Sequence, residues 1–365
     1  MIESRTQCIH CDHVGLQRFH TYWECQACGH RYPCVDGIPR LYTESEIGEA
    51  DRQLRDHLYT NILSRFYGFI MPFLSIPVRP IRMSLLHWGV YGLMVCWFVL
   101  LFWRTGQWLL IRRLQPITTL DVLAAILLVA SIALIRRYPY VWKLLVLAIP
   151  TKISLSLHPF HPAKSFREVH AEFQKEFRDK PETLHMLDIA TGSCNSLFRH
   201  GWMELHARHV GVDLSETMLL QGARFMAAHG IPIDFAFADA HRLPFAAETF
   251  DIVTCYGALN GFTSPRKALA EMARVTKDGG RILFLDEQLY ENASLVERAY
   301  SDGVLAGHNT INRCPVEAMP AEFEDVQVHQ VYQFYYICTA RRRARAASAA
   351  GDAGEPMPLQ LEAVG

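Results

Sequence analysis

Residues 184–193, LHMLDIATGS, decide the fold of the C-terminal half of the chain. An apolar run ends at the acid Asp188, a turn of small residues follows, and residues 194–198 start a helix. This order lets a ligand approach the backbone at the carboxyl edge of a parallel sheet. The stretch therefore predicts an α/β domain with a ligand site at that edge.

Downstream segments repeat this pattern. HVGVDLS at 209–215 is a second strand ending in an acid, Asp213, which is suited to accept hydrogen bonds from two ribose hydroxyls. The other expected elements, in chain order, are a helix over 216–229, strands over 233–239 and 250–255, a helix over 265–275, a turn over 277–280, a strand over 280–286 and a closing hairpin over 323–340. The ordered series predicts one doubly wound sheet.

The series resembles class I S-adenosylmethionine-dependent methyltransferases, in the group that includes quinone and sterol C-methyltransferases. The pieces that carry the resemblance are LDIATGS, GVDLSETML, FADAHRLPF, FDIVTCYGALN and ALAEMARVTKDGGRILF, within residues 184–286. The resemblance implies a Rossmann-like, seven-stranded domain over 153–345, with S-adenosylmethionine as cofactor and methyl transfer as activity. A dehydrogenase of similar layout would show a fuller glycine fingerprint.

The resemblance also implies which residues meet the methionine end of the cofactor. Asp188, Ala190 and Gly192 would line it, although the family often has glycine at the position of Ala190. Cys255 and Tyr256 would lie beneath the sulfonium.

At the nucleoside end, the resemblance implies that Asp213 holds the ribose and that Leu214 lies against the adenine. Asp239 would meet the adenine amino group, with Ala240 beside it. The chain departs from the family at Cys194, where glycine is usual, so a side chain stands where the backbone normally approaches the ligand.

The residues do not single out a catalytic group. Methyl transfer is an in-line displacement, so alignment supplies much of the rate, and a base is needed only if the acceptor loses a proton. Candidates near the expected mouth are Tyr256, Asn260, Glu287, Tyr290 and His308. His170 could cover the cofactor. For each of these residues, ordinary hydrogen bonding or packing is the alternative.

Five of the ten cysteines fall within the first 34 residues. Cys8-x2-Cys11 and Cys25-x2-Cys28, separated by thirteen residues, have the spacing of a structural zinc site with four cysteine ligands. We therefore expect a zinc ribbon over residues 1–42, which is similar to the small domains related to methyltransferase activator subunits. Reduced thiols without metal, or iron in place of zinc, are the alternatives.

Long apolar runs are concentrated in residues 79–152. Met83 to Trp103 is 21 residues without a formal charge, and about 20 helical residues cross a bilayer core. Val122 to Ile135 adds a second run of 14 residues. We expect a transmembrane or interfacial helical hairpin over 79–152, preceded by a helical linker over 43–78. Core helices of a soluble domain are the alternative for each run.

Charge and composition limit the partners. The 36 Lys and Arg residues nearly balance 37 Asp and Glu residues, which argues against a strongly basic nucleic-acid binder. The first residues lack the apolar stretch of a secretory signal, so we expect a reducing compartment. Residues 346–365 lack periodicity and are expected to be disordered.

Together these features predict an enzyme that methylates a small lipophilic acceptor, such as a quinone, isoprenoid or lipid, at a membrane. The zinc ribbon and the catalytic domain would both lie on the cytoplasmic side, where the cofactor is made. An RNA methyltransferase and a non-catalytic scaffold with the same fold are the alternatives, and the first requires a basic face.

Overall fold

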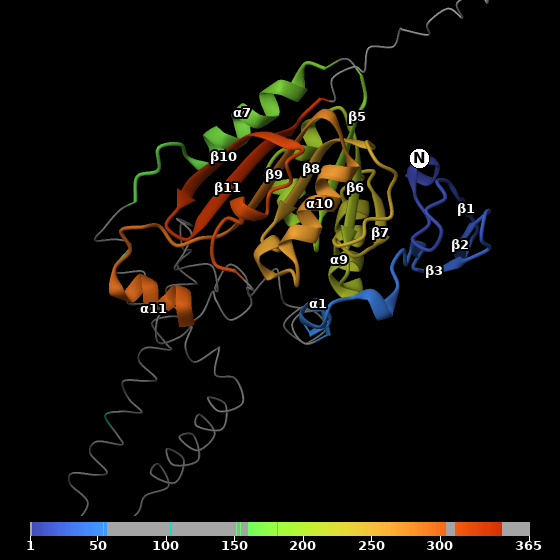
Figure 1. The fold of residues 1–365 in the computed structure, drawn as a ribbon, viewed down its shortest axis with the longest axis horizontal. Coiled ribbons are helices and arrows are strands. Elements are labelled where there is room, and N and C mark those ends of the chain that lie inside the picture. The colour runs from blue at the N-terminus through green and yellow to red at the C-terminus, as the bar shows by residue number, and fades with distance from the viewer. Residues whose placement is uncertain are drawn as a thin grey trace, which may run out of the picture.

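The computed structural model describes residues 2–53, 55–56, 103, 151, 154, 160–180, 182–303 and 311–344 (Figure 1). The expected hairpin over 79–152, apart from single positions, the linker beyond residue 56 and the expected tail over 346–365 lie outside these residues. Among the helices of the described ranges, none has the length and apolarity needed to span a bilayer.

A seven-stranded sheet forms the centre of the described structure. Its spatial order is β10-β11-β9-β8-β5-β6-β7, in which β11 pairs antiparallel with β9 and β10, and the remaining pairs are parallel. The strands are β5 (Leu184–Ile189), β6 (Ala207–Asp213), β7 (Asp234–Phe237), β8 (Phe250–Tyr256), β9 (Thr276–Glu287), β10 (Phe323–Tyr332) and β11 (Tyr335–Arg342). The expected seven-stranded Rossmann-like fold is confirmed. The strand order reverses between β5 and β8, which is where such sheets bind ligands.

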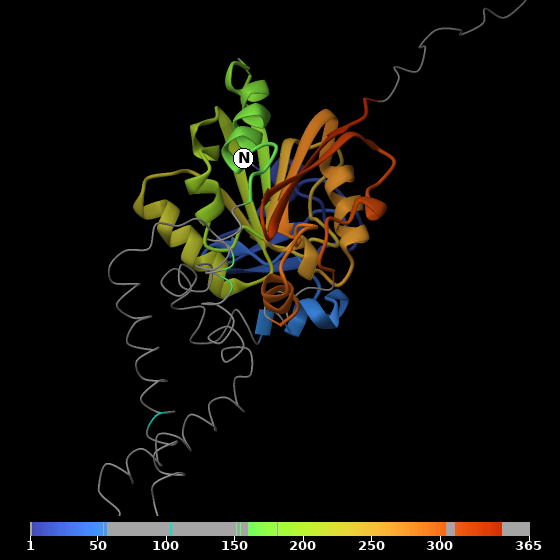
Figure 2. The same ribbon diagram turned by 90° about the vertical axis from the view of Figure 1, so that its left-hand side faces the viewer.

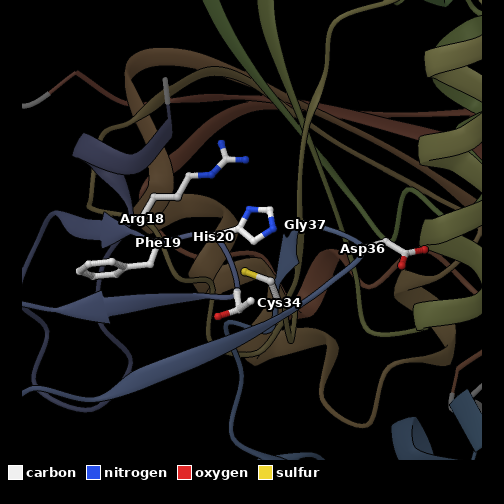
Figure 3. A pocket seen from close by; sticks show the side chains of 7 residues that line it. Arg18, Phe19, His20, Cys34, Asp36 and Gly37 are labelled. Atoms are coloured by element: carbon white, nitrogen blue, oxygen red, sulfur yellow. The ribbon is translucent and has the colours of Figure 1, made fainter.

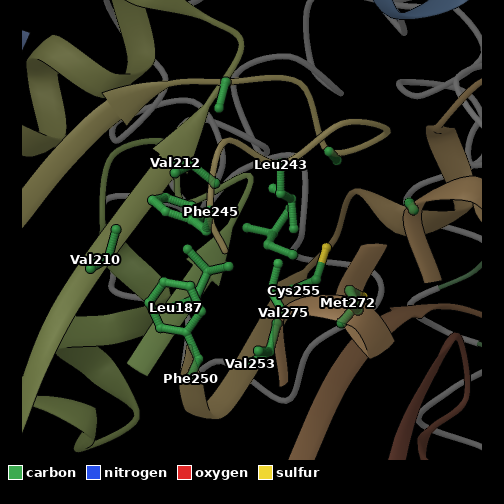
Figure 4. Packing of buried hydrophobic residues seen from close by; sticks show 14 of the residues in the cluster. Leu187, Val210, Val212, Leu243, Phe245, Phe250, Val253, Cys255, Met272 and Val275 are labelled. Carbon is green, nitrogen blue, oxygen red and sulfur yellow. The ribbon is translucent and has the colours of Figure 1, made fainter. Parts of the chain in front are cut away.

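Helices cover both faces of this sheet (Figure 2). They are α7 (Phe166–Arg178), α8 (Asn195–Arg199), α9 (Glu216–Ala228) and α10 (Pro265–Val275). Helix α11 (Leu295–Gly303) lies beyond one end of the sheet (Figure 1). Buried residues of α7 and α8 pack with Trp202 in one apolar cluster, whereas buried residues of α10 pack in another with Leu187, Val253 and Phe250 (Figure 4). The sheet therefore separates two layers of core.

Local chemistry explains where α10 begins. Ser264 Oγ accepts a hydrogen bond from Lys267 N, and Pro265 occupies the first turn, where its missing N–H is not needed. The expected turn over 277–280 lies inside β9 instead of before it. Thr276 pairs with Phe250 and Arg281 with Ile252, so the turn is an insertion that bulges from the strand.

The first 42 residues form a second, smaller sheet with the order β1-β2-β3-β4. Its strands are β1 (Leu16–Arg18), β2 (Tyr22–Cys25), β3 (Arg31–Val35) and β4 (Ile38–Pro39), and all three pairings are antiparallel. We call residues 2–42 the ribbon. A 3-10 helix, Glu44–Glu46, and helix α1 (Glu49–Gln53) follow it.

The ribbon is docked against the outer edge of the large sheet, beside β7 (Figure 1). Arg40 pairs parallel with Phe237, and Thr6 pairs antiparallel with Phe245. Leu41 N donates to Phe237 O at 2.8 Å, and Leu41 belongs to the same apolar cluster as the α10 side of the sheet. The ribbon thus covers an edge that would otherwise expose unpaired backbone groups.

Candidate functional site

The carboxyl ends of β5, β6, β7 and β8 meet at one edge of the sheet, because these strands are parallel neighbours. Three acids expected to bind the cofactor stand at this edge: Asp188 near the end of β5, Asp213 at the end of β6 and Asp239 two residues after β7. The acids that are far apart in sequence are therefore gathered at the switch point of the sheet.

Asp188 is 2% exposed and turns toward β8. Its Oδ1 accepts a hydrogen bond from Thr254 Oγ1 at 2.6 Å. Burial raises the pKa of this carboxyl to about 7 despite that bond. The side chain therefore links β5 to β8 next to the loop that follows β5.

The loop after β5 is built from residues with positive φ: Ala190 at 53°, Gly192 at 51° and Cys194 at 60°. Glycine adopts this region without strain, whereas Ala190 and Cys194 each carry a Cβ there. The Cys194 thiol is fully buried and lies against α9, since a Cβ added to Gly222 would meet Sγ at 2.8 Å and Gly192 O at 2.6 Å. The cysteine side chain packs under the loop, with its Sγ against α9.

The Asp213 side chain connects the loop after β5 to the loop after β6. Its Oδ2 accepts from Gly192 N at 2.8 Å, and its Oδ1 accepts from Ser215 N at 2.7 Å. Each carboxylate oxygen has a second lone pair, so two ribose hydroxyls could bind without breaking either bond. Burial raises the pKa of Asp213 to about 6. Leu214, the next residue, is half-buried beside it.

Asp239 and Ala240 are both buried at the end of β7. Asp239 Oδ1 accepts from His241 N at 2.9 Å and from His241 Nδ1 at 2.7 Å. No described residue donates to Oδ2 of this carboxylate. That oxygen remains available for a donor on a ligand. The sequence interpretation did not consider His241, although it directly follows Asp239-Ala240 in the same motif.

Cys255 and Tyr256 end β8 but point to different layers. The Cys255 thiol is buried in the cluster that contains Leu243 and Met272, and burial raises its pKa well above the ordinary value (Figure 4). Tyr256 belongs to the opposite layer, packed against the apolar cluster of α7 and Trp202. The side chains of Cys255 and Tyr256 therefore pack in different apolar clusters, on opposite faces of the sheet.

The Tyr256 hydroxyl takes part in two hydrogen bonds. It accepts from Trp202 Nε1 at 2.8 Å and donates to His170 Nε2 at 2.8 Å, because His170 Nδ1 lies 3.2 Å from the carbonyl oxygen of Phe166 and must donate to it. Burial lowers the pKa of His170 to about 4, so this imidazole stays neutral. The sequence could not reveal this network, because its members come from α7, the segment after α8 and β8.

Asn260 is buried completely and joins three segments. Its N donates to Asp286 Oδ2 at 2.8 Å, its Nδ2 donates to the Glu287 carbonyl at 2.6 Å, and its Oδ1 accepts from Tyr336 at 3.0 Å. The Tyr290 hydroxyl donates to Glu297 Oε2 at 3.0 Å. These contacts connect Asn260 and Tyr290 to neighbouring segments of the domain. His308 lies outside the described residues.

The four expected cysteine ligands come together in the ribbon. The sulfur atoms of Cys8, Cys11, Cys25 and Cys28 all lie within 4.8 Å of one another. Cys8 Sγ is 3.7 Å from Cys28 Sγ, and Cys11 Sγ is 3.5 Å from Cys25 Sγ. A tetrahedral zinc with Zn–S bonds of about 2.3 Å requires sulfur separations of about 3.8 Å, so the cluster has the size of such a site.

A cavity of about 700 Å³ lies elsewhere on the ribbon, between the turn after β1 and the β3–β4 turn (Figure 3). Its lining residues are Arg18, Phe19, His20, Thr21, Cys34, Asp36 and Gly37. None of the residues expected to bind the cofactor or the metal lines it.

Residues 187–284 match a family of known proteins described as a methyltransferase domain. The quinone methyltransferase UbiE of Roseobacter denitrificans, named for ubiquinone and menaquinone biosynthesis, is 33% identical over 117 residues, which cover 32% of this chain and 46% of the relative. The demethylmenaquinone methyltransferase of Clavibacter sepedonicus is 39% identical over 101 residues, covering 28% of this chain and 40% of the relative.

The chain spans less than half the length of these two curated relatives. Among solved structures, phosphoethanolamine N-methyltransferase 2 of Haemonchus contortus superposes with a TM-score of 0.39 at 16% identity, covering 48% of this chain and 52% of that one. The matched residues contain β6, β7, β8 and the second half of β5, whose carboxyl ends form the acid-lined edge. The chain therefore contains a methyltransferase domain over these residues, and this domain is similar to that of quinone C-methyltransferases.

Proposed function

We propose that the protein transfers a methyl group from S-adenosylmethionine to a ring carbon of a quinone-type acceptor. The observation that carries the proposal is the joint placement of Gly192, Asp213 and Asp239 at one edge of the sheet, with Asp213 bonded to the Gly192 backbone. The names of the similar proteins supply the acceptor class.

The chemistry is a single displacement. A carbon of the acceptor attacks the methyl group, the carbon–sulfur bond of the sulfonium breaks, and the electron pair stays on sulfur as S-adenosylhomocysteine forms. The proton on the methylated ring carbon then leaves to solvent or a base. Since no covalent enzyme intermediate is required, the contribution of the protein is alignment and desolvation of the two reactants.

We further propose that residues 79–152 hold the enzyme at a membrane, with the ribbon and the methyltransferase domain on the cytoplasmic side. Supporting this are the 21 uncharged residues from Met83 to Trp103 and the lipophilic character of quinones. Single cysteines introduced over residues 104–116 should react with a membrane-impermeant reagent only from the opposite side. Labelling of that segment from the cytoplasmic side would contradict the topology.

A structural zinc ion held by Cys8, Cys11, Cys25 and Cys28 completes the proposal. Four thiolates close the coordination shell, so this metal would stabilise the ribbon and take no part in methyl transfer. A segment of this size buries too little apolar surface to be stable alone, which gives the metal a clear role in folding.

Binding and transfer can be tested on the full chain. S-adenosylhomocysteine should bind by calorimetric titration, and Asp213→Ala should weaken it about ten- to a hundredfold, because charge-assisted hydrogen bonds to the ribose are lost. Asp213→Asn should be milder, since the amide oxygen keeps one acceptor.

Transfer should appear as radiolabelled methyl groups in the quinone fraction of a lipid extract, and a strain lacking the protein should accumulate quinones lighter by one methyl group. A folded wild-type protein that binds no S-adenosylhomocysteine would refute the proposed function.

A further inference from the structure

Residues 40–51, which comprise the end of the ribbon and the residues after it, cross the loops at the nucleoside end of the proposed cofactor site. We call this segment the strap. Its contacts, in chain order, are Arg40 Nη2 to Glu216 Oε1 at 2.6 Å, Leu41 N to Phe237 O at 2.8 Å, Glu46 Oε1 to Arg242 Nη1 at 3.2 Å and Asp51 Oδ1 to Thr263 N at 3.1 Å. Two of the contacted residues lie close to the site acids in sequence: Glu216 is three positions after Asp213, and Arg242 is three positions after Asp239.

These contacts differ in how firmly they can hold the neighbouring side chains in place. The ion pairs of Arg40 and Arg242 are between partly exposed side chains, and such pairs hold geometry weakly because water screens them. Asp51 is 7% exposed, and its Oδ2 has no hydrogen-bond partner in the described structure. A buried carboxylate oxygen without a donor is costly, so its orientation points to a specific role.

That oxygen faces His241. Asp51 Oδ2 lies 3.8 Å from His241 Nδ1, and the same nitrogen lies 2.7 Å from Asp239 Oδ1. His241 Nε2 accepts a hydrogen bond from Ser264 N at 3.2 Å, so in the neutral ring the proton is on Nδ1. The Asp51 charge favours that arrangement, because it lies beside the nitrogen that carries the proton.

The result is a fixed Asp239 carboxylate. The backbone and the ring of His241 both donate to Oδ1, which leaves Oδ2 as the oxygen available to a ligand. An adenine amino group is a donor, and a carboxylate oxygen held in place selects it over a ligand that offers an acceptor there.

We propose that Asp51 and His241 are positioning residues that orient Asp239 for the amino group of the cofactor's adenine, so that the strap is a part of the cofactor site. This inference rests on the proposed function, since it requires that the site binds S-adenosylmethionine.

The test compares two ligands on the full chain by calorimetric titration. S-adenosylhomocysteine carries the amino group, whereas S-inosylhomocysteine has a carbonyl oxygen in its place. The wild-type protein should prefer the first by about ten- to a hundredfold. A merely structural defect would weaken both ligands equally, so the ratio of the two dissociation constants is the quantity to follow.

His241→Phe keeps a ring of similar size but removes the donor, and the ratio should fall to within about threefold of unity. His241→Asn should retain most of the ratio, because its side-chain N–H lies close to the position of Nδ1. Failure of the asparagine variant to exceed the phenylalanine variant would contradict the role of the Nδ1 proton.

Asp51→Asn tests the strap. Its amide oxygen can still accept from Thr263 N, but its NH2 then faces the Nδ1–H of His241, and the two donors oppose each other. The ratio should fall at least about threefold. Glu49→Gln, an exposed position on the same helix, is the matched control and should leave the ratio unchanged.

The outcomes separate the two proposals. Wild-type binding of S-adenosylhomocysteine, combined with wild-type ratios in both His241→Phe and Asp51→Asn, would overturn the inference and leave the proposed function intact. No binding by the folded wild type would overturn the proposed function and this inference with it.

Discussion

The ribbon and the large sheet are stabilised by different means, although they share one apolar core. The ribbon strands are two to five residues long, and its four cysteine sulfurs cluster within 4.8 Å. The sheet strands are four to twelve residues long and are covered by helices on both faces. The proposed zinc ion would stabilise the small region at one point, whereas the large sheet is stabilised by burial over a wide area.

The two regions also differ in where they keep charge. The large sheet buries carboxyl groups at its ligand-binding edge, and burial raises the pKa values of Asp188 and Asp213. The charged residues of the ribbon, such as Arg31 and Glu24, form ion pairs at its surface. Buried acids reduce stability in exchange for a polar site, and the surrounding core must offset that cost.

The largest effect is expected from substitutions that remove the proposed zinc ion from the ribbon. Wild-type protein should contain about one zinc per chain, and Cys25→Ser combined with Cys28→Ser should lose it, together with much of the ribbon's folding free energy, which is about 10–16 kcal/mol in isolated zinc-finger peptides. Metal analysis and thermal unfolding measure both. Cys34→Ser, outside the cluster, should keep the metal, and full zinc content in the double variant would contradict the site.

The next largest effect is expected where Gly222 of α9 lies close to the loop after β5. Gly222→Ala places a Cβ 2.6 Å from Gly192 O and 2.8 Å from Cys194 Sγ, so the loop after β5 must move. We expect a loss of about 1–3 kcal/mol in unfolding free energy and at least about tenfold weaker binding of S-adenosylhomocysteine.

Adding Cys194→Ala to Gly222→Ala should recover only part of this loss, because the clash with backbone oxygen remains. Denaturant titration measures the unfolding free energy, and calorimetric titration measures the affinity for S-adenosylhomocysteine. Full recovery would show that the thiol alone limits the approach of α9.

A smaller effect concerns pH. The pKa of Asp188 is about 7 in the folded protein, above its ordinary value of 3.8, so the folded state binds more protons between these values. The free energy of unfolding should therefore fall as pH rises, with the loss complete above about pH 7 and amounting to roughly 1–3 kcal/mol from pH 5 to 8.

Asp188→Asn should flatten this slope, since the amide does not ionise and can still accept from Thr254. Asp325→Asn, at a carboxyl 69% exposed, should leave the slope unchanged. Denaturant unfolding at several pH values measures it, and equal slopes in the wild type and Asp188→Asn would contradict the assignment.

The smallest effect comes from the family-like substitution Cys194→Gly. Glycine removes the strain of the left-handed backbone, worth about 1 kcal/mol, but also removes a buried thiol packed against α9. The two terms oppose each other, so unfolding free energy should change by less than about 1 kcal/mol and affinity for S-adenosylhomocysteine by less than about threefold. A tenfold gain in affinity would mean that the thiol crowds the ligand.

Elements with strong local signals were predictable from the sequence. Helix α10 begins at Pro265 as expected, because Ser264 caps it and the apolar residues recur with helical spacing. The position of Asp213 at the end of β6 also follows from the apolar run before it, whereas β7 ends at Phe237, two residues before the expected end at Asp239. The cysteine spacing predicted the cluster that the ribbon forms.

Contacts between distant segments were not predictable. Nothing in the sequence near Tyr256 indicates that His170 and Trp202 bind its hydroxyl, and nothing near Asp51 indicates that it faces His241. Such contacts depend on how layers pack, and a single sequence carries no local signal of that packing. The turn over 277–280 was placed correctly in sequence, but its insertion into β9 depends on pairing with β8.

The pairing between the strap and the edge of β7 has a consequence for biosynthesis. Leu41 and its partner Phe237 at the end of β7 are 196 positions apart along the chain. At about 5–20 residues per second, the ribosome adds the second roughly 10–40 s after the first. During that interval the nascent ribbon has no sheet to dock on, and Leu41 lacks the partner that covers it. The proposed zinc ion, held by four cysteines that all precede residue 29, would stabilise the ribbon until β7 is translated.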